Sequence, residues 1–278
     1  MGDKLSMIIK IVSSILQALV CGSIFYNLKL DSSSIFLRPG ALFFPILYFL
    51  LEGLSETTGA FMGRPILSRQ KRFGFYRPTA FVIANAITDL PMVIVQISCF
   101  SLILYFMSGL QMNAARFFTF WIILIAYTLC SMQLFRAVGA LCKKFGIASM
   151  ISGFLSTIFF VYGGYLIPFE KMHVWFRWIF YLNPGAYGLL GEVLWDVKVK
   201  CEPSELIKFA APTGQTCGAY MAEFITAQTG YLIDSSATEC QFCQYSTGAD
   251  YAKTFNLREK YYAWRDVSIF FSFNFERG

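Results

Sequence analysis

The sequence predicts an all-α protein that crosses a membrane several times, and three observations support this fold class. Hydrophobic residues make up 56% of the 278 residues and charged residues only 14%. The apolar residues gather in long runs, and basic residues concentrate in short segments between them. A soluble domain carries about a quarter charged residues, because its surface must be hydrated. This chain has too few polar groups to cover itself, so lipid must be its main solvent.

Five stretches have the length and composition of a membrane-spanning helix, which needs about 20 mostly apolar residues. They lie at 7–28, 40–62, 79–107, 117–141 and 147–167. The third contains Pro91, which predicts a kink because proline removes a backbone hydrogen bond. The first is not a cleaved signal peptide, because it lacks a small-residue cleavage site and further spans follow it. We therefore expect five spans.

The loop charges predict the orientation. Residues 63–77 contain five basic residues and no acidic one, and Lys143 and Lys144 follow the fourth run. The loops at 29–37 and 108–115 carry almost no net charge. By the positive-inside rule the basic loops and the N-terminus face the cytoplasm. The net charge of +6 is thereby explained by topology, and nucleic acid is not an expected partner.

The composition changes at residue 168. An aromatic stretch at 175–181, followed by Asn183 and Pro184, predicts a short helix that dips into the outer leaflet. Charged residues within 168–197 disfavour an ordinary sixth span there: Glu170, Lys171, Arg177, Glu192 and Asp196. Residues 198–262 are polar with nearly balanced charge, which is typical of an external loop.

Four of the eight cysteines lie in this external segment: Cys201, Cys217, Cys240 and Cys243. An even number of cysteines in an oxidising compartment predicts disulfides, and four cysteines allow three pairings. A zinc site is disfavoured because the only histidine, His173, lies far away in the sequence.

Charged residues lie within the second, third and fourth apolar runs: Glu52 and Glu56, Asp89, and Arg136. Each costs about 2.5–3.5 kcal/mol at the bilayer centre, so each should have a partner or water. They can pair with one another or with Arg64 and Arg69. Two roles stay open, a structural salt-bridge cluster and a relay between the cytoplasmic loop and the spans.

The sequence contains no GxxxxGK[ST] phosphate loop, no HExxH and no GxSxG. We therefore expect no catalytic residues, no metal and no cofactor in this chain.

Ordered motifs resemble one family over essentially the whole chain: GRPILSRQKRFGFYRPTAF, ITDLP, LFRAVGA, YGGYLIPFEKMHVWFRWIFYLNPGAYG and ATECQFC. They look like the membrane domain of fungal pleiotropic-drug-resistance ABC transporters of the ABCG type. The resemblance implies the type II ABC exporter (ABC-2 type) bundle, with a coupling helix near 64–77, re-entrant helices at 168–197 and a disulfide-bonded external loop. Within that loop we expect two disulfides, with Cys217 joined to Cys240 or Cys243.

The resemblance also implies a function and partners. The implied function is ATP-driven export of hydrophobic or amphiphilic compounds, that is drug efflux, from a multi-pass protein of the plasma membrane. ATP and Mg²⁺ would bind to nucleotide-binding domains that this chain lacks. The implied partners are those domains, a second membrane domain, hydrophobic small molecules and the lipid bilayer.

The chain departs from the family pattern at its end, where residues 263–278 hold only the start of a sixth span. Residues 1–195 resemble the first membrane domain of such proteins, whereas 201–262 resemble the external loop of the second. The chain is therefore interpreted as a truncated or spliced product. Two other classes stay open: a non-transporting remnant or regulatory subunit, and a gradient-driven carrier that uses Glu52, Glu56 and Asp89.

The resemblance also places a substrate cavity between spans two and five. Carried over by position, the cavity residues are Leu47, Tyr48, Leu51, Phe154, Thr157, Phe160 and Val161, and the upper gate is Tyr165 with Leu166. Helical spacing puts Leu47, Tyr48 and Leu51 on one face of span two, and residues 154, 157 and 161 on one face of span five. For any one of these residues, packing between helices or contact with lipid is an alternative role.

Overall fold

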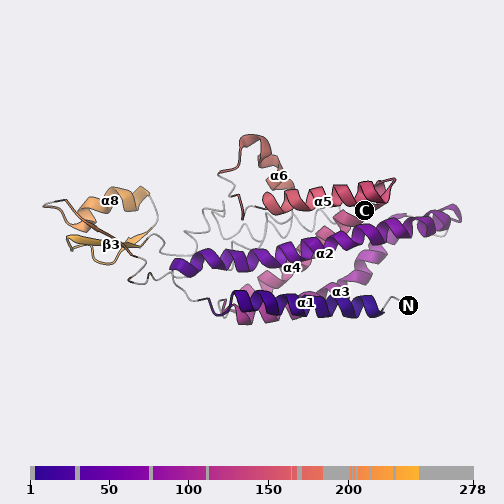
Figure 1. The fold of residues 1–278 in the computed structure, drawn as a ribbon, viewed down its shortest axis with the longest axis horizontal. Helices are drawn as coiled ribbons and strands as arrows, with labels where there is room; N and C mark the ends of the chain where they lie inside the picture. Colours follow the sequence, from indigo (N-terminus) through magenta and orange to yellow (C-terminus); the bar gives the residue numbers. More distant parts are fainter. Residues whose placement is uncertain are drawn as a thin grey trace.

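Five long helices form a bundle in the computed structural model (Figure 1). The structure describes residues 4–28, 32–74, 78–110, 113–163, 165–167, 171–183, 201, 203, 206–212, 214–227 and 230–243. The long helices are α1 (Lys4–Ile24), α2 (Ser32–Arg72), α3 (Pro78–Met107), α4 (Ala114–Leu141) and α5 (Phe145–Val161). Within the described residues, the first four are long and apolar enough to cross a membrane.

The first four helices pack mainly as two pairs, α2 with α4 and α1 with α3, and α3 also contacts α4. Large side chains fill the space between them, among them Phe49, Phe100, Phe120, Tyr127 and Phe135. Many equally apolar residues lie on the outer surface of α1, including Ile8, Leu16 and Val20. Exposed apolar side chains of this kind suit a helix whose outer solvent is hydrocarbon.

Small residues let α1 and α3 approach closely. Ser14, Ala18 and Gly22 are spaced four apart on α1, and the first two are completely buried. A Cβ atom at Gly22 would lie 2.8 Å from Sδ and 2.9 Å from Cβ of Met107 in α3. Small residues at this spacing are typical of membrane helices that pack backbone against backbone.

We expect Gly22→Leu to destabilise the bundle by about 1–3 kcal/mol, because the larger side chain must displace Met107 and push α1 away from α3. The measurement is the fraction of detergent-solubilised protein that stays monodisperse after heating. Ser23→Leu is the matched control, since Ser23 is exposed on the same turn. Equal heat resistance of the two variants would contradict the close contact.

The second helix continues beyond the span that the sequence predicts. α2 has 41 residues and runs through most of the expected loop 63–77 as far as Arg72. The described part of the expected coupling helix near 64–77, residues 64–72, is helical and extends α2 itself, and its coupling role stays a prediction. Ile66 to Arg72 are mostly good helix formers, and the helix ends before Gly74, whose φ of 70° favours glycine.

The fifth helix is shorter than the run 147–167. It has 17 residues and is about 26 Å long at 1.5 Å per residue, near the lower limit for a span. The chain leaves the helix at Tyr162 and Gly163. A Cβ atom at Gly163 would lie 3.0 Å from the carbonyl oxygen of Phe159, so glycine allows the chain to turn closely over the helix end.

Two short helices follow α5, namely η2 (Val174–Phe176) and α6 (Arg177–Leu182). Trp175 and Trp178 are exposed, as expected at a membrane–water boundary. Asn183 ends α6, and its side chain donates a 2.7 Å hydrogen bond to the carbonyl oxygen of Phe159 in α5. The rest of the predicted re-entrant segment, from residue 184, and the truncated sixth span at 263–278 lie outside the described residues.

The predicted external segment contains a small folded lobe that stands apart from the bundle, beyond the end where α2 begins (Figure 1). The strands β1 (Ile207–Ala210), β3 (Glu239–Cys243) and β2 (Tyr231–Leu232) form an antiparallel sheet in the order β1-β3-β2. Beside it lies α8 (Cys217–Ala227). Disulfides join Cys201 to Cys243 and Cys217 to Cys240. Cys217 thus pairs with Cys240, one of the two partners expected for it.

Candidate functional site

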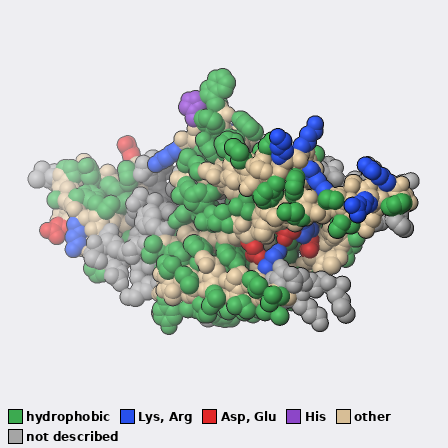
Figure 2. All heavy atoms as spheres, turned by 45° about the vertical axis from the view of Figure 1, so that its right-hand side comes forward, with side chains coloured by type: hydrophobic (Ala, Val, Ile, Leu, Met, Phe, Trp, Pro, Cys, Tyr) green, Lys and Arg blue, Asp and Glu red, His purple; other side chains and the backbone are tan. Residues whose placement is uncertain are grey.

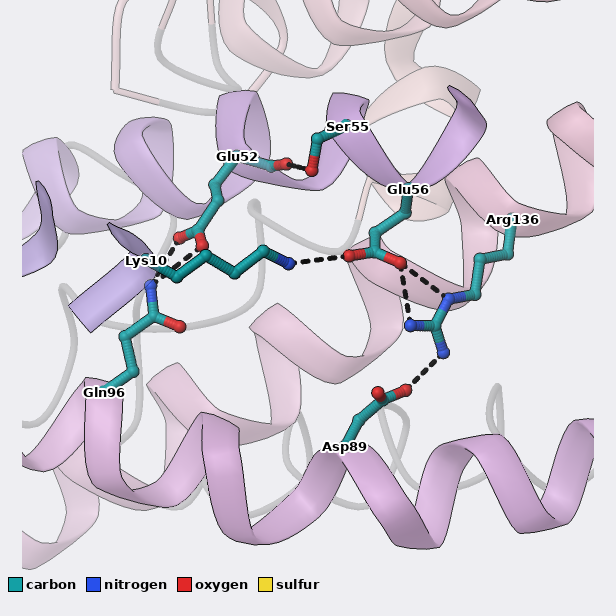
Figure 3. A network of polar contacts seen from close by, with 7 residues as sticks. All are labelled: Lys10, Glu52, Ser55, Glu56, Asp89, Gln96 and Arg136. Atoms are coloured by element: carbon teal, nitrogen blue, oxygen red, sulfur yellow. Dashed lines mark hydrogen bonds and ion pairs between the residues drawn. The ribbon is translucent and has the colours of Figure 1, made fainter. Parts of the chain in front are cut away.

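A single arginine joins three helices inside the bundle. Arg136 of α4 donates from Nε and Nη2 to Oε2 of Glu56 in α2, at 2.9 and 2.7 Å. Its Nη1 donates to Oδ2 of Asp89 in α3 (Figure 3). A guanidinium group suits this task because its donors lie in one plane and point in several directions.

The first helix joins the same cluster through a lysine. Nζ of Lys10 donates to Oε1 of Glu56 at 2.9 Å, so the two oxygens of Glu56 bind cations from two different helices. The Glu56 side chain is only 14% exposed and that of Arg136 is 20% exposed. In such surroundings the removal of one partner leaves a charge that water reaches poorly.

One helical turn before Glu56, a second carboxylate binds an amide. Nε2 of Gln96 in α3 donates to both oxygens of Glu52, at 2.9 and 2.7 Å. Gln96 is almost completely buried. We name the six residues Lys10, Glu52, Glu56, Asp89, Gln96 and Arg136 the polar cluster (Figure 3). Together they connect α1, α2, α3 and α4.

The polar cluster borders a small cleft of about 50 Å³. Its other lining residues are mostly apolar: Phe49, Gly53, Met92, Val93, Thr128 and Met132. Figure 2 shows acidic and basic atoms grouped together on a face that is otherwise largely apolar. A cleft of this size has room for a few water molecules but not for a drug-sized compound. It is therefore a site of helix contact and charge compensation rather than a substrate pocket.

The sequence predicts part of this cluster. Glu56, Asp89 and Arg136 meet as expected, whereas Arg64 and Arg69 do not join them. Arg64 instead donates to the carbonyl oxygen of Ala140 at the end of α4, and its Cζ lies 5.0 Å above the ring of Phe61. Arg69 is exposed further along α2.

Lys10 and Gln96 are cluster members that the sequence analysis does not identify. Lys10 is the only charged residue of the apolar run 7–28, and Gln96 is a polar residue seven positions after Asp89 in the run 79–107, which is the available signal. A polar group inside a membrane helix costs free energy unless it has a partner, so such residues mark contacts between helices.

The predicted cavity residues differ in how far they are exposed. Leu51, Phe154 and Thr157 are exposed, Leu51 to 50% and Phe154 to 69%, and they are available to a partner or a substrate. Tyr48 packs into the bundle instead, where its ring stacks on Phe100 at 5.6 Å and its hydroxyl lies 3.3 Å from Oγ of Ser13.

The other predicted pathway residues lie between these extremes. Leu47 and Val161 are half-buried. Phe160 and Tyr165 both contact the ring of Phe43 in α2, with ring centroids 5.7 and 4.7 Å apart. Leu166 is exposed. Phe43 therefore connects the C-terminal end of α5 and the expected gate to α2.

Comparisons with known proteins give a consistent result. Residues 1–191 match the family described as ABC-2 type transporter. The chain is 67% identical over 239 residues to ABC multidrug transporter G of Aspergillus fumigatus. These residues make up 85% of this chain and 18% of that protein. It is 44% identical over 210 residues to ABC multidrug transporter H of the same organism, covering 74% of this chain and 15% of that protein.

A more distant relative is ABC transporter G family member 9 of Dictyostelium discoideum, 40% identical over 223 residues, which cover 78% of this chain and 15% of that protein. The chain spans less than a fifth of the length of these curated relatives. The family match includes all five long helices and the polar cluster. The chain therefore belongs to the ABC-2 type transporter family, as a membrane domain of the fungal ABCG type.

Proposed function

We propose that this chain forms the transmembrane pathway of an ATP-driven exporter of hydrophobic or amphiphilic compounds. ATP and Mg²⁺ would act on nucleotide-binding domains, and this chain would convert their movement into movement of the spans. Two Aspergillus fumigatus relatives are named as multidrug transporters, which supports this substrate class.

The observation that carries the proposal is the continuity of α2 between its basic end and the polar cluster. Arg72 lies 16 residues after Glu56 in a continuous helix, a distance of about 24 Å. Arg64 also ties this segment to the end of α4. A force applied near Arg69 would reach Glu56 through a helix, and from there Arg136, Asp89 and Lys10 in the three other helices.

We propose that the basic end of α2 and the N-terminus face the cytoplasm, because positive residues gather at this end of the bundle. The segment 64–72, whose residues Ile66, Arg69 and Arg72 are exposed, would then form, with the exposed Lys143 and Lys144, the surface that receives the ATPase domains. The open face with Leu51, Phe154 and Thr157 would border the substrate cavity shared with a second membrane domain. In this arrangement the disulfide-bonded lobe lies outside the plasma membrane.

The gradient-driven carrier is the less favoured alternative. A proton carrier needs carboxylates that exchange protons with water during transport. Glu56 and Asp89 are instead held by Arg136, and Glu56 also by Lys10, which favours a fixed charge. This pairing supports a mechanical role for Glu56 and Asp89, two of the three carboxylates that the carrier would use.

The test uses a chimaera: the Aspergillus multidrug transporter G in which the matching 239-residue segment is replaced by the corresponding residues of this chain. We expect the chimaera to export rhodamine 6G from yeast cells that lack their own drug exporters, because the exchanged segments are 67% identical. The same chimaera with an inactivated ATPase site is the control and should not export. A chimaera that reaches the plasma membrane and exports nothing, while the parent exports, would refute the proposal.

A further inference from the structure

One buried pair of hydroxyl groups fixes α5 to the rest of the bundle. Oγ1 of Thr57 in α2 lies 2.9 Å from Oγ of Ser152 in α5, and each residue is only 2% exposed. Among the described residues, this is the only hydrogen bond between side chains that α5 makes with another helix. At the two ends of α5, aromatic rings contact α2: Phe145 contacts Phe61, and Phe160 contacts Phe43.

The hydroxyl pair continues into α4. Oγ1 of Thr57 also lies 3.3 Å from the carbonyl oxygen of Phe135, to which only the threonine can donate. A hydroxyl has one hydrogen, so Ser152 must then donate to Thr57. The result is a directed chain of hydrogen bonds from α5 through α2 to α4.

This chain lies directly beside the polar cluster. Thr57 follows Glu56 and Phe135 precedes Arg136, so the ion pair and the hydroxyl chain join neighbouring residues of the same two helices. Gly139 makes the close approach possible, because a Cβ atom there would lie 2.6 Å from the carbonyl oxygen of Thr57. The ion pair of the neighbouring Glu56 and the close contact with α4 both fix the position of Thr57. Ser152 is therefore bound to a residue that has little freedom to move.

Ser152 lies on the buried side of α5, away from the open side. At 3.6 residues per turn, Phe154 and Thr157 lie about 200° and 140° around the helix from Ser152. Both are exposed, whereas Ser152 is buried. A rotation of α5 about its axis would break the bond to Thr57 and would carry Phe154 and Thr157 to new positions.

We infer that the Thr57–Ser152 hydroxyl pair determines substrate specificity from outside the pathway, by setting the rotation of α5 and thus the position of its open face. This inference rests on the proposed export function. The two hydroxyls are positioning groups, because neither of them lies on the open face. Their removal is expected to change the choice among substrates and not only the amount of folded protein.

The experiment uses the chimaera described above and two dyes, rhodamine 6G and Nile red. We expect Thr57→Val, which keeps the shape and removes the hydroxyl, to change the ratio of the two export rates by roughly two- to tenfold, the factor that one net hydrogen bond contributes. Ser152→Ala should change the ratio in the same direction, and the double variant should do no more than either single one. Thr57→Ser keeps the hydroxyl and should therefore keep the original ratio.

Two controls separate specificity from packing. Ser156→Ala removes a buried serine one turn along α5 whose hydroxyl binds only its own helix, and Thr58→Val changes the exposed neighbour of Thr57. Both should keep the original ratio. If Thr57→Val fails to reach the membrane, Ser152→Ala decides the question.

An unchanged dye ratio in Ser152→Ala, at any level of expression, would overturn the inference and would leave the pair with a packing role. Equal shifts in Ser156→Ala would overturn it as well. A failure of the proposed function looks different, because the unaltered chimaera would then export neither dye.

Discussion

Replacement of Arg136 by methionine is expected to be the most damaging single change within the bundle. It leaves Glu56 with Lys10 alone and Asp89 without its arginine. Removal of one partner from a poorly hydrated ion pair costs about 3–5 kcal/mol, because the remaining charge has lost its compensation. We expect most of the tagged chimaera that carries this change to be degraded or retained inside the cell, measured as its fraction at the cell surface.

Two further variants show whether geometry matters as well as charge. Arg136→Lys keeps the charge but loses the planar fork, so it cannot bind Glu56 and Asp89 at once as the guanidinium does, and we expect an intermediate loss. Lys144→Met is the matched control, since this exposed cation lies at the turn after α4 and should have little effect. A normal surface level of Arg136→Met would show that the cluster does not stabilise the bundle.

The second large effect is expected in the disulfide-bonded lobe. Cys240→Ser opens the bond to Cys217, which closes 23 residues of chain. Loss of a cross-link over a loop of this length costs about 3 kcal/mol in the chain-entropy account. The open fraction of the lobe should then rise about a hundredfold, and trypsin cleavage after the exposed Lys208 should accelerate by a similar factor.

The control for this prediction is Cys142→Ser, which changes a free cysteine outside the lobe. Cys217→Ser should match Cys240→Ser, and the double variant should be no worse than either, because all three lose the same bond. Non-reducing peptide mapping of the unaltered protein should recover the Cys217–Cys240 and Cys201–Cys243 pairs. Four free thiols, or cleavage after Lys208 that is insensitive to Cys240→Ser, would contradict the pairing.

The sequence by itself determined the fold class and most helix positions, because burial in lipid is decided locally. Any stretch of about 20 apolar residues satisfies its backbone groups as a helix, whatever its neighbours are. The same reasoning indicated that Glu56, Asp89 and Arg136 need partners, since a lone charge in hydrocarbon is costly wherever it lies. The ordered motifs indicated the family, which the match over residues 1–191 confirms.

The exact ends of helices were harder to predict from the sequence. α2 continues to Arg72 because its basic residues form helix readily once they leave the apolar region, and polarity alone does not end a helix. α5 ends early because Gly163 permits a close turn over Phe159. Hydropathy measures which solvent a segment prefers, and so it does not report where the backbone changes direction.

Only the tertiary structure decided which side chains meet. Lys10 lies 46 residues from Glu56, Arg136 lies 80 from it, and Ser152 lies 95 from Thr57. Such contacts depend on which helices are neighbours and on their rotation, and the α2 and α3 sequences have weak amphipathic patterns because lipid and core are both apolar. For this reason the sequence did not show that Tyr48 faces Phe100 in the bundle rather than the open side with Leu51. In the lobe, the sequence allowed Cys217 to join either Cys240 or Cys243, and only the tertiary structure shows that it joins Cys240.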